Sequence, residues 1–272
     1  MSSIKNVLRS IVVAAFIIGI PTPIRAQWLD YPTAGVPKTP SGLPNLVAPT
    51  PRTADGKPDL SGIWKAEDTR PCPPAGCYDM NVGEQFFDIG WGLKGGLPYQ
   101  PWAADIVKKR TAENGKDDHE TRCLPIGVPR MLIHPLFRKI LQMPGLVVIL
   151  FERDTAYRQI FTDGRPLPID PQPSWNGYST GRWEGDTLVV QTIGFRDGMW
   201  LDRNGSPMTE AGKVTERFRR LNYGKMEIEV TIDDPKAYTS PWTIKLNQFI
   251  VLNTELLDYV CAENEKDSTH LK

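Results

Sequence analysis

Apolar and polar residues alternate with a period of two along much of the chain after its first sixty residues. The clearest run is 226–233, in which one face carries only apolar side chains: Met226, Ile228, Val230 and Ile232. This pattern predicts a β-strand with one buried and one solvated face. Similar short runs predict further strands, so that the full set is 60–65, 138–143, 146–153, 157–163, 178–183, 187–195, 214–221, 226–233, 242–251 and 255–261.

Tight turns separate several of these runs. Two have a central glycine, in Glu184-Gly185-Asp186 and Tyr223-Gly224-Lys225, and another is Pro144-Gly145. Turns of this length join antiparallel hairpins. About ten successive antiparallel strands with little helix predict a mainly β fold, an up-and-down barrel whose closure removes exposed strand edges.

Two further segments interrupt or precede the predicted barrel. The insertion 66–138 contains the one clear helix signal, from Pro101 to about Glu113, because proline suits the first helical position and basic residues suit the last turns. Residues 27–58 form a proline-rich arm without apolar periodicity, which we expect to lie along the surface or to be mobile. We expect 59–272 to form a single domain.

Residues 1–26 have the pattern of a secretory signal. The basic residues Lys5 and Arg9 precede an apolar run, 10–20, that is too short to span a bilayer. Cleavage after Ala26 would leave a periplasmic or secreted protein without an integral membrane segment. An uncleaved N-terminal anchor is the alternative.

All four cysteines follow this segment, at Cys72, Cys77, Cys123 and Cys261. An even number in an oxidising compartment favours two disulfides, with three possible connectivities. Cys72 and Cys77 bracket a short turn and can close a small loop, which leaves Cys123 to pair with Cys261. A zinc site of four thiolates is the alternative, although its usual short paired spacings are absent.

Composition and motifs limit the classes of function. The formal net charge is zero, so no broad basic surface is available for nucleic acid. The chain contains no Gly-x-Ser-x-Gly elbow, His-Glu-x-x-His pair, phosphate loop or dinucleotide fingerprint. We therefore expect no cofactor and no bound metal, and we expect the partner to be a small molecule; the sequence does not identify protein partners.

The sequence around the first predicted strand carries a family resemblance. Residues 59–65 read DLSGIWK, and Gly62-Ile63-Trp64 resembles the Gly-x-Trp signature of lipocalins and related barrels. That resemblance implies that Trp64 plugs the closed end of a barrel, and the long insertion looks like the lid of fatty-acid-binding relatives. The segments TADGKPDLSGIW, YRQIFTDGRPLP, GRWEGDTLVV, TERFRR and DDPKAY also resemble a family of exported bacterial proteins of unassigned function.

The order of the loops predicts where a ligand would bind. In an up-and-down barrel the connections alternate between the two ends. We therefore expect the tight turns 154–156, 184–186, 222–225 and 252–254 at one end, where the insertion also begins, and the long connections 164–177, 196–213 and 234–241 at the other. Long loops gathered around one mouth are the usual site of binding or catalysis.

The polar and aromatic residues expected around this mouth can orient a ligand carboxylate or carbonyl group. They are Asp163, Arg165, Trp175, Asn176, Arg196, Asp197, Trp200, Asp202 and Tyr238. The alternative for each of them is ordinary turn chemistry or a surface ion pair.

Two further residues are candidates for acid–base chemistry. Glu216 shares a predicted strand face with apolar residues, and a carboxyl group in an apolar interior can act as a general acid or base. It can instead form a structural pair with Arg158 or Arg182. His134, in an apolar run, is either an acid–base group or a core histidine. We interpret the charged stretch 117–120, which contains His119, as solvated.

These residues support three hypotheses. The first is a lipocalin-like protein that binds a small apolar or aromatic molecule in the barrel, with its polar end at Arg165, Trp175 and Tyr238. The second is a cofactor-free lyase, isomerase or hydrolase, in which Glu216, Asp163 or His134 transfers a proton. Arg158 or Arg165 would then stabilise an oxyanion. The third is an envelope assembly protein without a small-molecule site.

Overall fold

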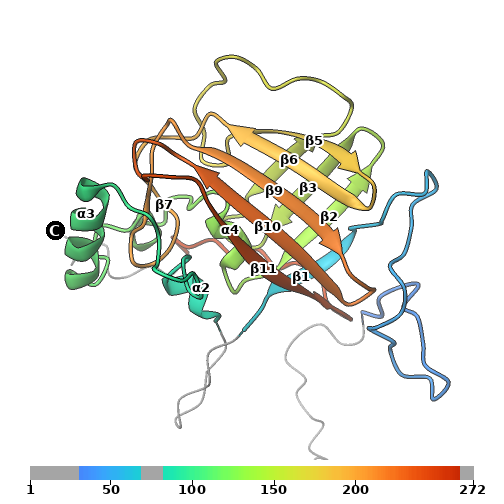
Figure 1. The fold of residues 1–272 in the computed structure, drawn as a ribbon. Helices are drawn as coiled ribbons and strands as arrows, with labels where there is room; N and C mark the ends of the chain where they lie inside the picture. The colour runs from blue at the N-terminus through green and yellow to red at the C-terminus, as the bar shows by residue number, and fades with distance from the viewer. Residues whose placement is uncertain (1–30, 69–81, 264–272) are drawn as a thin grey trace, which may run out of the picture.

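Nine β-strands close into a barrel in the computed structural model, which describes residues 31–68 and 82–263 (Figure 1). Around the ring the order is β1 (Gly62–Ala66), β11 (Trp242–Val251), β10 (Lys225–Asp233), β9 (Lys213–Arg220), β6 (Thr187–Ile193), β5 (Tyr178–Glu184), β4 (Tyr157–Phe161), β3 (Leu146–Phe151) and β2 (Arg138–Met143). The predicted signal segment and the pair Cys72 and Cys77 lie outside the described residues.

The prediction of a mainly β barrel with about ten strands is confirmed, with one strand fewer. Residues 255–261, expected as the last strand, form only an isolated bridge between Tyr259 and Arg153. The long connection after β6 contains two short strands, β7 (Met199–Trp200) and β8 (Pro207–Met208), which pair with each other.

The barrel differs from an up-and-down barrel at one pair of strands. β4 and β5 run parallel, whereas the other neighbours in the ring are antiparallel. Every antiparallel pair reverses the strand direction, so a closed ring must contain an even number of such pairs. A ring of nine strands has nine pairs and therefore needs a parallel one. The expectation of a wholly antiparallel barrel is wrong at this position.

This parallel pair changes which loops share an end. The connection 162–177 crosses from one end of the barrel to the other (Figure 1). As a result, the turn 152–156 and the insertion lie at the same end as the connections 194–212 and 234–241, and we call this the loop end. The predictions that 154–156 and the insertion share an end with the tight turns are therefore wrong. The opposite end, the turn end, carries the β2–β3, β5–β6 and β9–β10 turns.

Trp64 fills the turn end of the barrel. Its indole is buried and Nε1 donates a hydrogen bond to the Leu60 carbonyl at 3.0 Å. The Arg220 guanidinium lies 4.9 Å from the indole ring centroid and donates to backbone carbonyl oxygens, including that of Asp59 at 2.6 Å. These contacts satisfy the polar atoms of both side chains and fill the barrel interior at this end.

The proline-rich arm lies along the turn end (Figure 1). The Tyr223 amide donates to the Ala48 carbonyl at 2.8 Å, and Arg52 pairs with Asp186 at 2.7 Å. The described part of the arm, 31–58, therefore lies on the surface, which is one of the two alternatives expected from its composition.

The insertion covers the loop end. It contains α2 (Glu84–Phe87), α3 (Pro101–Ala112), the 3₁₀ turn η1 (His119–Arg122) and α4 (Arg130–Ile133). The helix predicted from Pro101 is confirmed as α3. All four residues of α4 are buried, so this turn of helix fills the barrel mouth rather than covering it loosely.

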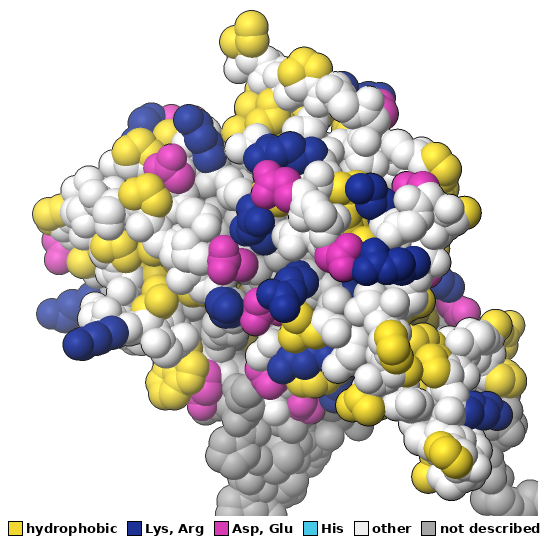
Figure 2. Space-filling view, turned by 45° about the vertical axis from the view of Figure 1, so that its right-hand side comes forward, with side chains coloured by type: hydrophobic (Ala, Val, Ile, Leu, Met, Phe, Trp, Pro, Cys, Tyr) yellow, Lys and Arg dark blue, Asp and Glu magenta, His cyan; other side chains and the backbone are white. Residues whose placement is uncertain are grey.

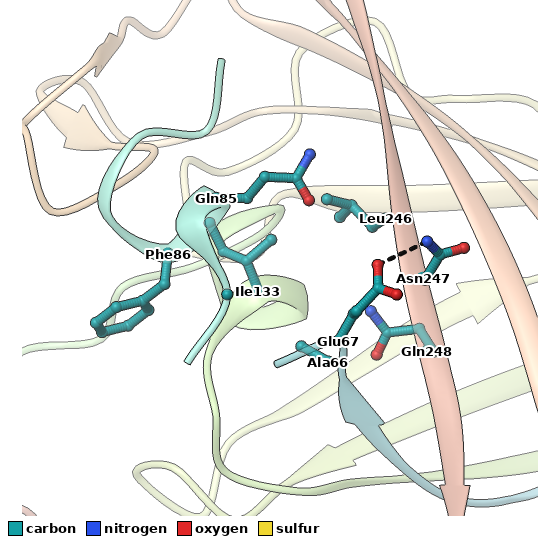
Figure 3. Close-up of a pocket in the computed structure, with 9 residues that line it drawn as sticks. Ala66, Glu67, Gln85, Phe86, Ile133, Leu246, Asn247 and Gln248 are labelled. Atoms are coloured by element: carbon teal, nitrogen blue, oxygen red, sulfur yellow. Dashed lines mark hydrogen bonds between the residues drawn. The ribbon is translucent and has the colours of Figure 1, made fainter. Parts of the chain in front are cut away.

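A cavity of only about 20 Å³ remains between α2, α4 and β11 (Figure 3). Asn247 Nδ2 donates to Glu67 Oε2 at 2.7 Å beside it, and Gln85 Nε2 donates to the Lys245 carbonyl at 3.1 Å. A space of this size holds one water molecule.

Charged side chains cover the outer face of the barrel. Figure 2 shows acidic and basic groups interleaved on one side of the molecule. The register explains part of this pattern, because Glu229 faces Arg217 and Glu227 faces Arg219 across β9 and β10. Opposite charges on facing residues stabilise the strand pair slightly and keep this surface solvated.

Candidate functional site

A buried ion pair lies inside the barrel wall. Arg158 Nη1 donates to Glu216 Oε1 at 2.8 Å, and Nη2 bonds the other carboxylate oxygen. Arg158 Nε donates to Ser179 Oγ at 3.1 Å and Nη2 to Thr192 Oγ1 at 2.8 Å. All four side chains come from inward-facing positions of β4, β9, β5 and β6, so the alternation of the strands brings them together.

This pair decides between the two partners considered for Glu216. Arg182 points outward and pairs with Glu184 at 2.8 Å, where both side chains are exposed. Arg158 and Glu216 are nearly inaccessible, with side-chain exposures of 1% and 0%. A bidentate pair with every oxygen bonded is a structural arrangement that neutralises both charges.

His134 is also buried, at the loop end. Its Nδ1 accepts a hydrogen bond from the Leu136 amide at 3.2 Å, and Nε2 lies 3.1 Å from Glu120 Oε1. With Nδ1 as an acceptor, the proton is on Nε2 and faces the carboxylate. Burial lowers the pKa of His134, and the carboxylate of Glu120 opposes this only in part. The contacts match a neutral core histidine.

The stretch 117–120, interpreted above as solvated, is partly buried. Asp118 is inaccessible and forms a bidentate pair with Arg130, with both distances at 2.7 Å. Glu120 accepts from Arg130 at 2.8 Å and from Arg203 at 3.1 Å, and Arg153 lies 3.1 Å from its other oxygen. Burial acts to raise the pKa of Glu120, but these cations and His134 outweigh it and hold the pKa well below its usual range.

An aromatic opening in the wall lies beside the parallel pair. A groove of about 510 Å³ runs between β4 and β5 on the loop-end side. β4 and β5 are paired only at Ile160–Ser179 and Phe161–Thr180, so the strands separate beyond that point. Its side chains come from three segments, and the aromatic ones among them are Tyr157, Phe161, Trp175 and Tyr178.

Polar groups lie along the wall and floor of this groove. Asn176 Nδ2 donates to the Tyr157 carbonyl at 3.0 Å, while Asn176 Oδ1 is buried and has no hydrogen-bond partner in the described part of the chain. Arg158 and Ser179 also line the groove, so the buried pair with Glu216 lies behind its floor. A buried acceptor without a partner is costly unless a ligand or a water molecule donates to it.

Two of the predicted site residues lie at the turn end, although Arg165 also contacts Phe161 and Tyr178 of the groove. Asp163 follows β4 and packs beside the β2–β3 turn, where the Thr162 amide donates to the Gly145 carbonyl at 2.8 Å. It therefore lies at the turn end and not at the long-loop mouth. Arg165 pairs with Asp163 at 2.6 Å, and its guanidinium is 4.0 Å from the Phe161 ring centroid. The expectation that both residues lie at the mouth is wrong, because the parallel pair reverses this part of the chain.

The remaining predicted ligand residues surround the groove or lie below the surface. The Arg196 guanidinium is 5.4 Å from the Trp175 ring centroid, at one edge of the groove. Trp200 is buried beneath Arg110, 4.3 Å away, and Tyr238 is buried with its hydroxyl donating to the Pro207 carbonyl at 2.8 Å. Trp200 and Tyr238 thus contribute to the core of the loop end.

Sequence reasoning missed Tyr157, Phe161 and Tyr178. Tyr157 and Phe161 share the outward face of β4, and Tyr157 is 63% exposed. Aromatic residues on the polar side of an alternating strand were the available signal, since solvated faces usually carry charged or small polar groups.

The expected pairing of Cys123 with Cys261 is present as a disulfide. It links the segment after η1 to the chain that follows β11. Within residues 31–68 and 82–263, no group of three or more His, Cys, Asp and Glu side chains is arranged to hold a metal ion. None of the helices in those ranges is long and apolar enough to cross a membrane.

The fold and groove define a closed mixed β-barrel with an aromatic groove in its wall. Comparison of the chain with family models, with curated proteins and with solved structures gives no match.

Proposed function

We propose that the protein binds a small apolar or aromatic molecule in the groove between β4 and β5. The observation that carries this proposal is the set of four aromatic side chains around a space of about 510 Å³, with one unsatisfied acceptor, Asn176 Oδ1, buried in its wall. Small-molecule sites are commonly concave, mostly apolar, several hundred Å³ in volume and equipped with few polar groups.

The groove is favoured over the interior of the barrel on packing grounds. Inward side chains such as Ile149, Val190 and Ile228 are buried, and Trp64 and α4 fill the two ends. The groove opens outward, so a ligand can enter without displacing core side chains. The same reasoning replaces the lipocalin-like binding mode expected from the sequence with a site in the wall.

The chemistry of the walls favours a planar ligand with a hydrogen-bond donor. Aromatic rings pack well in offset or edge-to-face arrangements with other rings. A ligand hydroxyl or amine would satisfy the buried acceptor Asn176 Oδ1 once that side chain turns toward the groove. Phenols, indoles and related aromatic molecules combine both properties.

Tyr157→Ala tests this proposal with little risk to the fold, because the side chain is largely exposed. Burial of this ring against a ligand contributes about 1.5–3 kcal/mol, so its loss should weaken binding roughly tenfold or more. We would measure the dissociation constants of a phenolic and indolic panel by fluorescence and thermal shift.

Trp91→Ala is the matched control, since Trp91 is an exposed aromatic residue outside the groove. It should bind like the unaltered protein. Equal losses in both variants, or no binding by the unaltered protein to any compound, would contradict the proposal.

A second candidate function, cofactor-free proton transfer, rests on the floor of the groove. Arg158 lines the groove and holds Glu216 directly behind it. A carboxylate bonded to a guanidinium can accept a proton from a bound ligand if that ligand reaches it. Turnover that is lost in Glu216→Gln while ligand binding persists would favour this candidate over simple binding.

Export to the periplasm stays a prediction from the first 26 residues.

A further inference from the structure

The chain after β11 runs back along the barrel from the turn end to the loop end. Lys139 Nζ donates to Glu255 Oε2 at 2.5 Å, and further on the Leu257 amide donates to Glu152 Oε1 at 3.1 Å. The segment then reaches Cys261, whose disulfide partner is Cys123. We call residues 252–261 the C-terminal strap.

The strap holds the turn that forms one wall of the groove. The Asp154 amide donates to the Tyr259 carbonyl at 3.0 Å, and Tyr259 forms an isolated parallel β-bridge with Arg153. The Arg153 guanidinium lies 5.7 Å from the Tyr259 ring centroid. Asp154 and Thr155 line the groove, so the strap contacts the back of this wall directly.

The disulfide attaches the same strap to a second wall. Pro125 lines the groove opposite the β4 turn and follows Cys123 by two residues. The bond between Cys123 and Cys261 therefore connects the segment carrying Pro125 to the segment that holds Asp154. Two walls that are 29 residues apart in sequence are tied together through one covalent link.

We propose that the C-terminal strap and its Cys123–Cys261 disulfide position the walls of the groove and thereby set its affinity for ligand. This inference rests on the proposed function. Cys123, Tyr259 and Cys261 act as positioning residues, since none of them lines the groove. Without the link, the β3–β4 turn keeps its ion pairs with Glu120 but loses the strap as a fixed backbone partner.

The primary test compares the unaltered protein with the double variant Cys123→Ser/Cys261→Ser. No reductant is used, because it would also act on the disulfide that the sequence predicts between Cys72 and Cys77. The expected result is a dissociation constant raised at least tenfold for the tightest-binding phenol or indole, measured well below the unfolding temperature, with an unchanged far-ultraviolet circular dichroism spectrum. An unchanged dissociation constant overturns the inference.

A destabilised control separates positioning from general loss of stability. Ile228→Ala opens a hole in the inner face of β10, away from the groove lining. It should lower the melting temperature while leaving the dissociation constant within twofold. Tyr259→Pro provides a second strap variant that retains the disulfide but alters the backbone that bonds Asp154.

Hydrogen exchange tests the positioning even if the unaltered protein binds none of the probes. In the unaltered protein the Asp154 amide should exchange slowly, because it donates a hydrogen bond to the Tyr259 carbonyl. In the double variant the Asp154 amide should exchange at least ten times faster. The exchange rate of the Phe151 amide in β3 should be the same in both proteins. Equal protection of Asp154 in both proteins overturns the positioning role, whereas absent ligand binding alone contradicts only the proposed function.

Discussion

At the scale of single residues, the groove depends on one backbone conformation. Gly177 follows Asn176 with φ at +61°, a region that favours glycine. A Cβ at this position would lie 2.7 Å from the Ile193 carbonyl oxygen and 2.7 Å from Thr192 Cγ2. Glycine is therefore required both by conformation and by space, and it fixes the direction in which Asn176 faces the groove.

Gly177→Ala should lower the free energy of unfolding by at least about 1–2 kcal/mol, the cost of a left-handed conformation for alanine. The clash with the Ile193 carbonyl should also move Asn176 and weaken ligand binding. Chemical denaturation and a binding titration measure the two effects. Gly185→Ala is the control for conformation alone, since its φ is +59° and nothing lies within 4 Å of an added Cβ.

Glu216→Gln should cost about 3–5 kcal/mol of unfolding free energy, because it leaves the buried Arg158 guanidinium without a counter-charge. The control is Glu184→Gln, which breaks exposed pairs with Arg182 and Arg217 and should change the unfolding free energy little, since solvent screens these charges. Urea unfolding at pH 7 distinguishes the two. Similar small losses in both variants would show that the interior pair is not essential to stability.

Polar residues differ in how well their roles could be predicted from sequence. The alternation of 214–221 placed Glu216 on the same face as apolar residues, and Arg158 or Arg182 was the expected structural partner. Asp118 and Glu120 were misjudged because a run of charges is usually solvated. Their partner Arg130 lies ten or more residues away along an irregular segment, and no periodicity indicates that the chain folds back there.

At the scale of strands and turns, local patterns were sufficient for most of the barrel. The strand at 226–233 and the helix from Pro101 formed as predicted, since side-chain period and end residues are local properties. Strand direction across the connection 162–177 is not local. A segment of this length can return at either end, so the sequence did not reveal that β4 and β5 run parallel.

The groove is a consequence of the parallel direction of β4 and β5. Antiparallel neighbours such as β5 and β6 pair along their whole length, but β4 and β5 share two register positions. The site was therefore predicted only in part: Trp175 and Asn176 were named from their loop, whereas the contribution of β4 required knowledge of where the strands separate.

At the scale of the whole molecule, a cluster of ion pairs connects the insertion, the β3–β4 turn and the β7–β8 loop. Glu120 is its common member and contacts Arg130, Arg153 and Arg203. Since these residues belong to separate segments, the protonation of the cluster affects how firmly the loop end is closed.

We expect stability to fall as the pH is lowered from about 7. The folded state holds the pKa of His134 below its ordinary value, so the unfolded chain binds a proton first as the pH falls through about 6.5. Glu120, whose pKa is also depressed, adds a further loss below about pH 4.5.

We would measure unfolding free energies by urea titration as the pH is lowered from 7.5 to 5. Uptake of one proton on unfolding should decrease them by up to about 1.4 kcal/mol for each pH unit. The His134→Gln variant has no imidazole to take up that proton. Its unfolding free energy should therefore change less with pH in this range, even if it is lower at every pH. If the unfolding free energy changes equally with pH in both proteins, groups other than His134 cause the loss of stability.

The pairing of β1 with β11 has a consequence for how the protein is made. Ile63 lies beside Val251 in the finished ring, so the seam closes between segments nearly 190 positions apart. A ribosome must release almost all of the chain before this seam can form, and until then β1 and β10 each present an unpaired edge. Contacts over such separations make assembly slow. A newly synthesised chain therefore spends a long interval open to chaperones and proteases.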